Sequence, residues 1–200
     1  WVNDFANVIS PAYKEKLSSL IAELEQKTSA EIFVVTISSI APYDEKEYAR
    51  SLFDNWKPGK KGKDNGVLML LALKERRWRI ETGYGVEGIL PDGLCGEIGR
   101  NYMAPYFKQG NYAEGLYQGV IKIAQAIGKD ANIELNALQG IKDVAPTDTN
   151  SQVSVDSGIM IILFLLFFGI LILPILLGRR KGNVFWGGGY GGGGGFGGGG

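Results

Sequence analysis

The sequence contains no histidine and only one cysteine, Cys95. Without histidine, the chain cannot form a Ser-His-Asp or Cys-His nucleophile pair, an imidazole-ligated zinc site or a histidine proton shuttle. A single cysteine cannot form an internal disulfide, so cysteine content does not indicate a redox compartment. These absences remove several common mechanisms of hydrolysis from consideration.

An excess of positive charge is also missing. The 200 residues carry 21 acidic and 21 basic side chains, and only Asp156, Arg179, Arg180 and Lys181 lie beyond residue 150. The first 150 residues therefore hold 20 acidic and 18 basic side chains. Such a nearly neutral region offers no basic face to a phosphate backbone, which excludes nucleic acid as an expected partner.

Charge is absent altogether from the run GIMIILFLLFFGILILPILLG, Gly158–Gly178. About 20 apolar residues, each rising about 1.5 Å along a helix, match the thickness of a bilayer core. Pro174 lies near the C-terminal end of the run, where a broken helical hydrogen bond is tolerated. The sequence therefore predicts one transmembrane helix over residues 157–178, embedded in the lipid bilayer.

The charges around this run predict its orientation. The basic segment Arg179–Lys181 follows it directly, whereas Asp148 and Asp156 precede it. Because basic residues favour the cytoplasmic side, we expect the N-terminal region outside the cytoplasm, in a periplasm or on a cell surface. The chain opens at Trp1, which is typical of a mature protein whose signal peptide has been removed.

The last segment, residues 179–200, follows its basic start with almost pure glycine and a few aromatic residues. Such a composition cannot bury a core, so it predicts a disordered cytoplasmic tail. The tail is interpreted as a plain flexible extension, or alternatively as a set of weak aromatic contacts for a cytoplasmic partner.

Residues 1–128 alternate between helical and strand patterns, as in an α/β domain. Buried strands separated by a helix imply a parallel crossover, and the short connection before residue 77 implies an antiparallel partner, so the sheet is mixed. The predicted helices are 11–28, one beginning after Asp44, 93–104 and 112–127, and the predicted strands are 31–38, 66–73 and 77–83. The expected fold is an α/β/α sandwich. Residues 129–156, with a possible short helix at 133–142, are interpreted as a stalk.

Two glycine-containing segments resemble phosphate-binding loops. Gly83–Gly88 fits GxGxxG, but it follows a hairpin strand and lacks the helix and acidic residue of a dinucleotide site. Lys57–Lys63 lacks the ending and the strand-helix setting of a P-loop, and is interpreted as a solvated basic loop that attracts anionic headgroups or phosphorylated ligands only weakly. Cys95 and Arg100 are one residue short of a cysteine-phosphatase loop, so Cys95 is interpreted as a core residue.

Acidic side chains form the most informative pattern. Asp64 and Asn65 come directly before a predicted strand, and Glu87 and Asp92 follow its antiparallel neighbour. Hairpin geometry brings these two loops to the same end of the sheet. Carboxylate and amide oxygens are the ligands that calcium and magnesium prefer. The pattern is compatible with a divalent-cation site, or alternatively with a turn cap and solvated carboxylates.

The sequence resembles the TPM domain family, named for thylakoid phosphatase-like, photosystem-repair and acetylcholine-receptor-modulating members. Four segments carry the resemblance and span residues 1 to about 128: VNDFANVIS, KGKDNGVLMLLAL, ETGYGVEGILPDG and PYFKQGNYAEGLYQGV. The resemblance implies a Rossmann-like α/β/α sandwich, followed here by the transmembrane helix. It also implies calcium or magnesium bound near the acidic loops, by Asp64, Glu87 and Asp92, with Asn65 and Asp4 as further candidates.

Two functions follow as hypotheses from these observations. The first is a non-catalytic, metal-binding accessory module that helps to maintain or assemble membrane proteins or their complexes. The second is a metal-dependent acid phosphatase, in which a cation polarises a phosphoryl oxygen and Glu87 or Asp92 orients water. Members of the family include both kinds of protein, so the resemblance alone does not select an activity.

Overall fold

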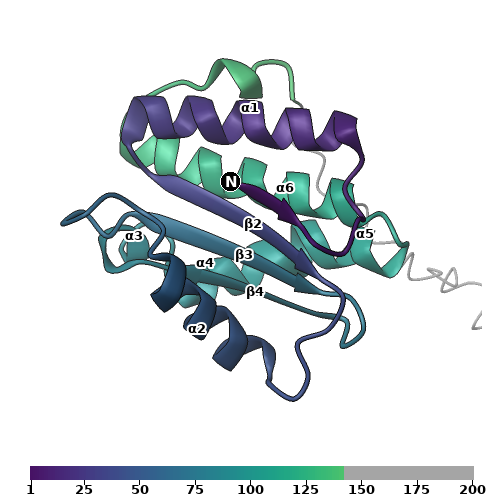
Figure 1. Cartoon of the computed structure of the whole chain (residues 1–200). Coiled ribbons are helices and arrows are strands. Elements are labelled where there is room, and N and C mark those ends of the chain that lie inside the picture. The colour runs from purple at the N-terminus through teal and green to yellow at the C-terminus, as the bar shows by residue number, and fades with distance from the viewer. Residues whose placement is uncertain (142–200) are drawn as a thin grey trace, which may run out of the picture. The chain divides into compact units, whose positions relative to one another are not determined.

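A mixed four-stranded sheet forms the centre of residues 1–141, the part of the chain that the computed structural model describes (Figure 1). The strands are β1 Val2–Asp4, β2 Glu31–Ile37, β3 Gly66–Ala72 and β4 Arg77–Thr82, and they lie side by side in that order. The first three are parallel, and β4 is antiparallel to β3. The predicted α/β class and mixed sheet are therefore confirmed.

The helices agree with the capping and periodicity of the sequence. They are α1 Pro11–Thr28, α2 Glu45–Trp56, α3 Tyr84–Glu87, α4 Asp92–Ile98, α5 Ala104–Lys108 and α6 Tyr112–Asp130, with a π-helical turn Gly99–Met103 (η1) and a 3-10 turn Asn136–Leu138 (η2). The side chain of Asp44 accepts a hydrogen bond from the N–H of Glu47 at 2.7 Å and so caps α2 as predicted. The single helix predicted at 93–104 is instead α4, η1 and the start of α5.

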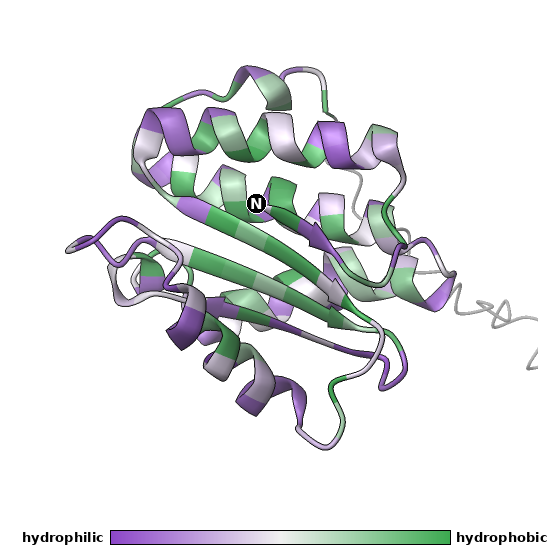
Figure 2. Cartoon of the chain, in the orientation of Figure 1, coloured by the Kyte–Doolittle hydropathy of each residue, from purple (hydrophilic) through white to green (hydrophobic). Residues whose placement is uncertain are grey.

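Hydrophobic cores cover both faces of the sheet. Among the described residues, α1, α4 and α6 pack on one face and α2 covers the other (Figure 1). Both central strands present apolar side chains to the two sides, and every residue of β3 is buried. Figure 2 shows this as continuous hydrophobic colour along β2 and β3. A strand that is apolar on both faces is typical of the middle of an α/β sheet.

Two short elements were not predicted. β1 has only three residues, too few for a recognisable alternation, and it forms because Val2–Asp4 pairs in parallel with Val34–Thr36. α3 is a single turn of four residues within the segment predicted as a glycine loop. Both elements depend on tertiary contacts, which a local pattern does not contain.

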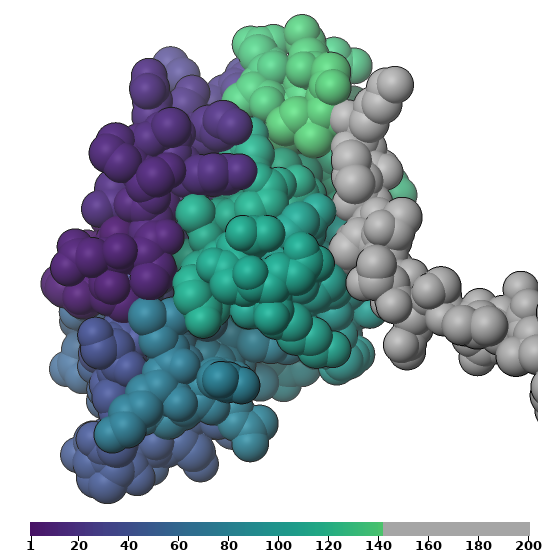
Figure 3. Space-filling model, turned by 90° about the vertical axis from the view of Figure 1, so that its right-hand side faces the viewer, coloured from purple at the N-terminus to yellow at the C-terminus, as the bar shows by residue number. Residues whose placement is uncertain are grey.

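The chain after residue 128 stays on the N-terminal domain as far as the structure describes it. α6 continues to Asp130, Leu135 is buried, and the carboxylate of Glu23 in α1 accepts hydrogen bonds from the N–H groups of Asn136 and Ala137. In Figure 3 this segment, in green, adjoins the purple N-terminal residues. The predicted transmembrane helix lies outside the described residues. Within residues 1–141, no helix is both long and apolar enough to cross a membrane.

Candidate functional site

The loop between α2 and β3 lies against the turn between β4 and α3. The N–H of Gly85 donates to the carbonyl oxygen of Asp64 at 3.0 Å, and the N–H of Gly83 donates to that of Gly66 at 2.8 Å. A Cβ atom on Gly85 would lie 1.8 Å from the carbonyl oxygen of Lys63, so glycine is required for this close approach. The predicted meeting of these two loops at one end of the sheet is confirmed.

Hydrogen bonds fix the base of the loop 57–65 to β2. The carboxylate of Glu31 accepts from the N–H of Gly59 and from the ammonium of Lys60, both at 2.7 Å. Although burial alone would raise the pKa of Glu31, these hydrogen bonds hold it below its ordinary value. The amide of Asn65 accepts from the N–H of Lys60 at 2.9 Å and donates to the hydroxyl of Ser29 at 3.1 Å. The oxygen and the nitrogen of the Asn65 side chain are therefore both hydrogen-bonded within the fold, which makes Asn65 a structural residue.

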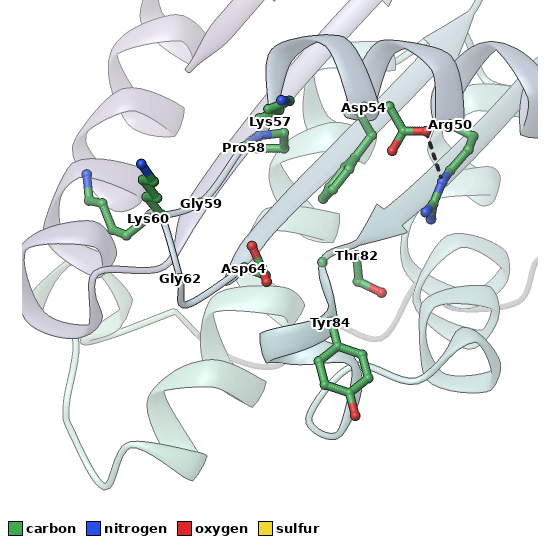
Figure 4. Close-up of a pocket in the computed structure, with 13 residues that line it drawn as sticks. Arg50, Asp54, Lys57, Pro58, Gly59, Lys60, Gly62, Asp64, Thr82 and Tyr84 are labelled. Carbon is green, nitrogen blue, oxygen red and sulfur yellow. Dashed lines mark ion pairs between the residues drawn. The ribbon is translucent and has the colours of Figure 1, made fainter.

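An open cleft of about 520 Å³ lies between this loop, α2 and the end of β4 (Figure 4). Its lining residues are Arg50, Phe53 and Asp54 of α2, then Lys57–Gly62 and Asp64 of the loop, then Thr82, Gly83 and Tyr84. The carboxylate of Asp64 lies in the middle of this cleft in Figure 4 and makes no hydrogen bond or ion pair within residues 1–141. Tyr84 is 85% exposed beside it. The cleft is therefore preformed, lined by several charged side chains and open to solvent.

The charges of the cleft divide into paired and unpaired groups. Arg50 of α2 pairs with Asp54 at 3.4 Å and with Glu81 of β4 at 3.2 Å. By contrast, Lys57 and Lys61 form no ion pair with any described residue. The cleft therefore offers two available cations and one available carboxylate to a ligand or partner.

Asp4 lies at the opposite end of the sheet from Asp64, because β1 pairs with the last residues of β2. Its carboxylate accepts from the N–H groups of Val8 and Ile9 and from the hydroxyl of Thr36, and pairs with Lys14 at 3.0 Å. Burial alone would raise the pKa of Asp4, but these bonds hold it below its ordinary value. Asp4 thus fixes the turn between β1 and α1 and is not placed with the other candidates.

The remaining candidates, Glu87 and Asp92, lie on separate elements of the described structure. Glu87 is an exposed residue at the end of α3, and Asp92 lies beside β4, where its 81% exposed side chain is 3.3 Å from Arg79. Within residues 1–141, no three acidic or cysteine side chains lie close enough together to hold a metal ion. The predicted residues therefore do not gather three carboxylates at one place, and calcium or magnesium binding stays a prediction.

Cys95 is buried in the core between α4 and the sheet. Burial, together with the nearby charge of Asp92, raises the pKa of its thiol to about 11. A thiol with such a pKa stays protonated at neutral pH, so it is a poor nucleophile. This agrees with its interpretation as a core residue.

The contribution of α2 to the cleft could not be recognised in the sequence. Arg50 and Asp54 are four residues apart on one helix face, a spacing that suggests only a surface ion pair. Their link to Glu81 depends on how α2 packs across β4. No local signal in the sequence contains that information.

Known proteins are similar to this chain in sequence and in fold. The family model of the TPM domain matches residues 2–126. The N-terminal domain of a protein from P. gingivalis, a solution NMR structure, is 36% identical with a TM-score of 0.62, and the match covers 67% of this chain and 85% of that one. The BA42 protein of the psychrophilic bacterium Bizionia argentinensis is 25% identical with a TM-score of 0.53, over 64% and 92% of the two chains. No curated protein matches the chain.

Proposed function

We propose that this chain, which belongs to the TPM domain family, is a membrane-tethered interaction module that binds membrane proteins or their complexes outside the cytoplasm. In this proposal, residues 1–141 form the binding domain. The apolar run at 157–178 anchors it in the bilayer, and the basic residues after that run keep the tail in the cytoplasm. The anchor and the orientation rest on the sequence alone.

The observation that carries the proposal is the charge of the open cleft. Lys57 and Lys61 project from a loop that is fixed at its base, and neither has an ion-pair partner within the described residues. A preformed surface loses little conformational entropy on binding, and unpaired cations favour an acidic partner surface. Exposed Tyr84 adds an aromatic contact of the kind enriched at protein interfaces. We expect the cleft to contact an acidic surface of the membrane partner.

The test is capture of partners by the full chain from the membranes of its own cells. A photo-crosslinking residue in place of Tyr84 would label proteins that contact the cleft. Lys57→Glu/Lys61→Glu should reduce the labelled set about tenfold, because two attractions become repulsions. The matched control is Lys74→Glu/Lys129→Glu, which makes the same charge change at two exposed lysines outside the cleft.

An unchanged labelled set in the cleft variant would contradict the proposal. Equal losses in the cleft variant and the control would also contradict it, because net charge and not the cleft would then govern capture. Circular dichroism of each variant establishes that folding is retained before the labelled sets are compared.

A metal-dependent phosphatase is the second candidate, and one observation favours it. The available lysines and the available carboxylate of Asp64 line the same cleft, where a phosphate group would be attracted. A cation would supply Lewis-acid chemistry there, but the described residues gather no three acidic or cysteine side chains around it. Release of phosphate from an aryl phosphate, sensitive to a chelator, would support this candidate over the first.

A further inference from the structure

β4 is the last strand of the sheet, and one of its edges pairs with no other strand of residues 1–141. In an antiparallel pair, alternate residues direct their backbone N–H and C=O groups toward the neighbouring strand. The hydrogen bond from Gly83 to Gly66 sets this alternation, so Arg77, Arg79 and Glu81 face β3. Trp78 and Ile80 therefore direct their backbone groups outward, and neither makes a backbone hydrogen bond on that side within residues 1–141.

A groove of about 430 Å³ runs beside this edge, between the start of α2 and the segment formed by α4 and η1. Its floor is Arg76–Ile80, and its walls include Glu45 and Lys46 on one side and Asp92, Gly96 and Arg100 on the other. The ring of Trp78 is held against Gly99, where a Cβ atom would lie only 1.9 Å from it. The groove is therefore fixed by packing within the fold, and the edge of β4 lies along its floor.

The groove is strongly cationic. Five basic side chains line it, and only two acidic ones do: Lys46, Arg76, Arg77, Arg79 and Arg100 against Glu45 and Asp92. Within the described residues, Lys46, Arg76 and Arg100 form no ion pair, and Arg77 is 4.0 Å from Glu45. This excess of positive charge favours an acidic occupant.

An apolar groove of about 570 Å³ adjoins the cationic one and shares Arg76 and Trp78 with it. Its lining includes Leu71, Phe107 and Tyr112. A chain that leaves the cationic groove past Trp78 would therefore meet a surface suited to a large apolar side chain.

We propose that the edge of β4 binds an extended acidic peptide of a partner protein, which adds as a fifth strand and places an apolar residue in the adjoining groove. Backbone hydrogen bonds to the strand edge would supply affinity, and the arginines would select for acidic side chains. The proposal goes beyond the function proposed above, because it concerns a different surface and does not require the cleft to bind anything.

In the structure without a bound peptide, the ion pair between Arg79 and Asp92 lies across the unpaired edge of β4. Arg79 leaves the α2 face of β4 and reaches Asp92 at the start of α4, on the other face. Because Asp92 is 81% exposed, the pair contributes little stability and is easily exchanged. A carboxylate of the incoming peptide takes the place of Asp92 on Arg79.

The test uses the full chain in detergent micelles and a fluorescein-labelled peptide of alternating glutamate and valine that ends in phenylalanine. Fluorescence polarisation should report binding, and Arg76→Glu/Arg100→Glu should weaken it by about tenfold or more. The matched control is Lys57→Glu/Lys61→Glu, which makes the same charge change in the cleft and should leave peptide binding unchanged. Because the control changes only the cleft, it distinguishes a loss of peptide binding at the groove from any effect of the cleft.

Backbone pairing is tested by two N-methylated peptides, methylated at alternate residues in opposite phases. One phase blocks the N–H groups that face β4 and should weaken binding by about tenfold, whereas the other should be tolerated. Binding of the unmodified peptide should also slow hydrogen exchange in residues 77–82.

Three results would overturn the proposal. The first is that the Arg76→Glu/Arg100→Glu variant still binds the peptide. The second is that the two methylation phases weaken binding equally. The third is that the protein does not bind the peptide but binds vesicles of anionic lipid in a way that depends on these arginines. The last result would assign the surface to a membrane and not to a peptide strand.

Discussion

The two ends of the central sheet use acidic residues in different ways. Where β1 and β2 end, the side chain of Asp4 is 2% exposed and is bonded to two backbone N–H groups, to Thr36 and to Lys14. Where β2 and β3 begin, the carboxylate of Asp64 has no partner within residues 1–141. Both residues were candidates for one metal site, yet only Asp64 is available to a ligand.

An acidic residue within a recognisable motif can therefore contribute either to stability or to binding. The carboxylate of Asp4 replaces the hydrogen bonds that a tight turn leaves unmade, and so closes the chain between β1 and α1. Asp64 sits in a loop that is held by other residues, Glu31 and Asn65. Within residues 1–141, the carboxylate of Asp64 makes no contact that holds this loop.

The largest expected effect is that of Asp4→Ala. Removing this carboxylate leaves the N–H groups of Val8 and Ile9 without their acceptor, which should lower the free energy of unfolding by about 3 kcal/mol. For a domain of this size the melting temperature should fall by roughly 10 °C. Asp64→Asn, which removes the charge but keeps a side chain that tolerates the positive φ of 49° at this position, should change the free energy by less than about 0.5 kcal/mol. Thermal unfolding of both variants measures the contrast, and equal losses would contradict it.

The next effect concerns the contact between the two loops of the cleft. Gly85→Ala places a Cβ atom 1.8 Å from a backbone oxygen that cannot move alone, so we expect a loss of about 2 kcal/mol. Gly88→Ala, three residues later and with nothing within 4 Å, is the matched control and should change stability by less than about 0.5 kcal/mol. Chemical denaturation compares the two, and a stable Gly85→Ala variant would show that the loops separate easily.

Much of the fold could be predicted from the sequence, because α1, α2, β2 and β3 each have a complete periodic pattern or cap. The meeting of the loops at Asp64 and Gly83 also followed from hairpin geometry. What could not be predicted depends on packing between distant segments. β1 forms only by pairing with β2. Asp4 is separated from Asp64 because β1 pairs near Thr36, at the far end of β2.

A smaller effect is expected from pH. The pKa of Asp4 is lower in the folded protein than its ordinary value of 3.8, so its stabilising contribution is present above that pH and is lost as the pH falls through the folded pKa. Between about pH 5 and pH 3, the native chain should lose more stability than Asp4→Asn, which does not titrate. Urea denaturation across this range measures the slopes. Parallel slopes would contradict the assigned role of Asp4.

The smallest effect is that of divalent cations, because the predicted ligands are not gathered at one place. We expect millimolar calcium or magnesium to raise the melting temperature by no more than about 2 °C. Any gain should disappear in Asp64→Ala and persist in Asp92→Ala, since Asp92 lies away along β4 beside Arg79. A gain that depends on Asp92 and not on Asp64 would show that the predicted cation binds elsewhere.

In the function that we propose, the available groups of the cleft bind a partner without phosphatase activity. The most direct measurement is phosphate release from an aryl phosphate by the purified full chain, with calcium, magnesium or manganese across pH, beside Asp64→Ala. The account predicts release no greater than the protein-free blank for both proteins. Release by the native chain that a chelator abolishes and that Asp64→Ala loses would contradict it and establish the phosphatase.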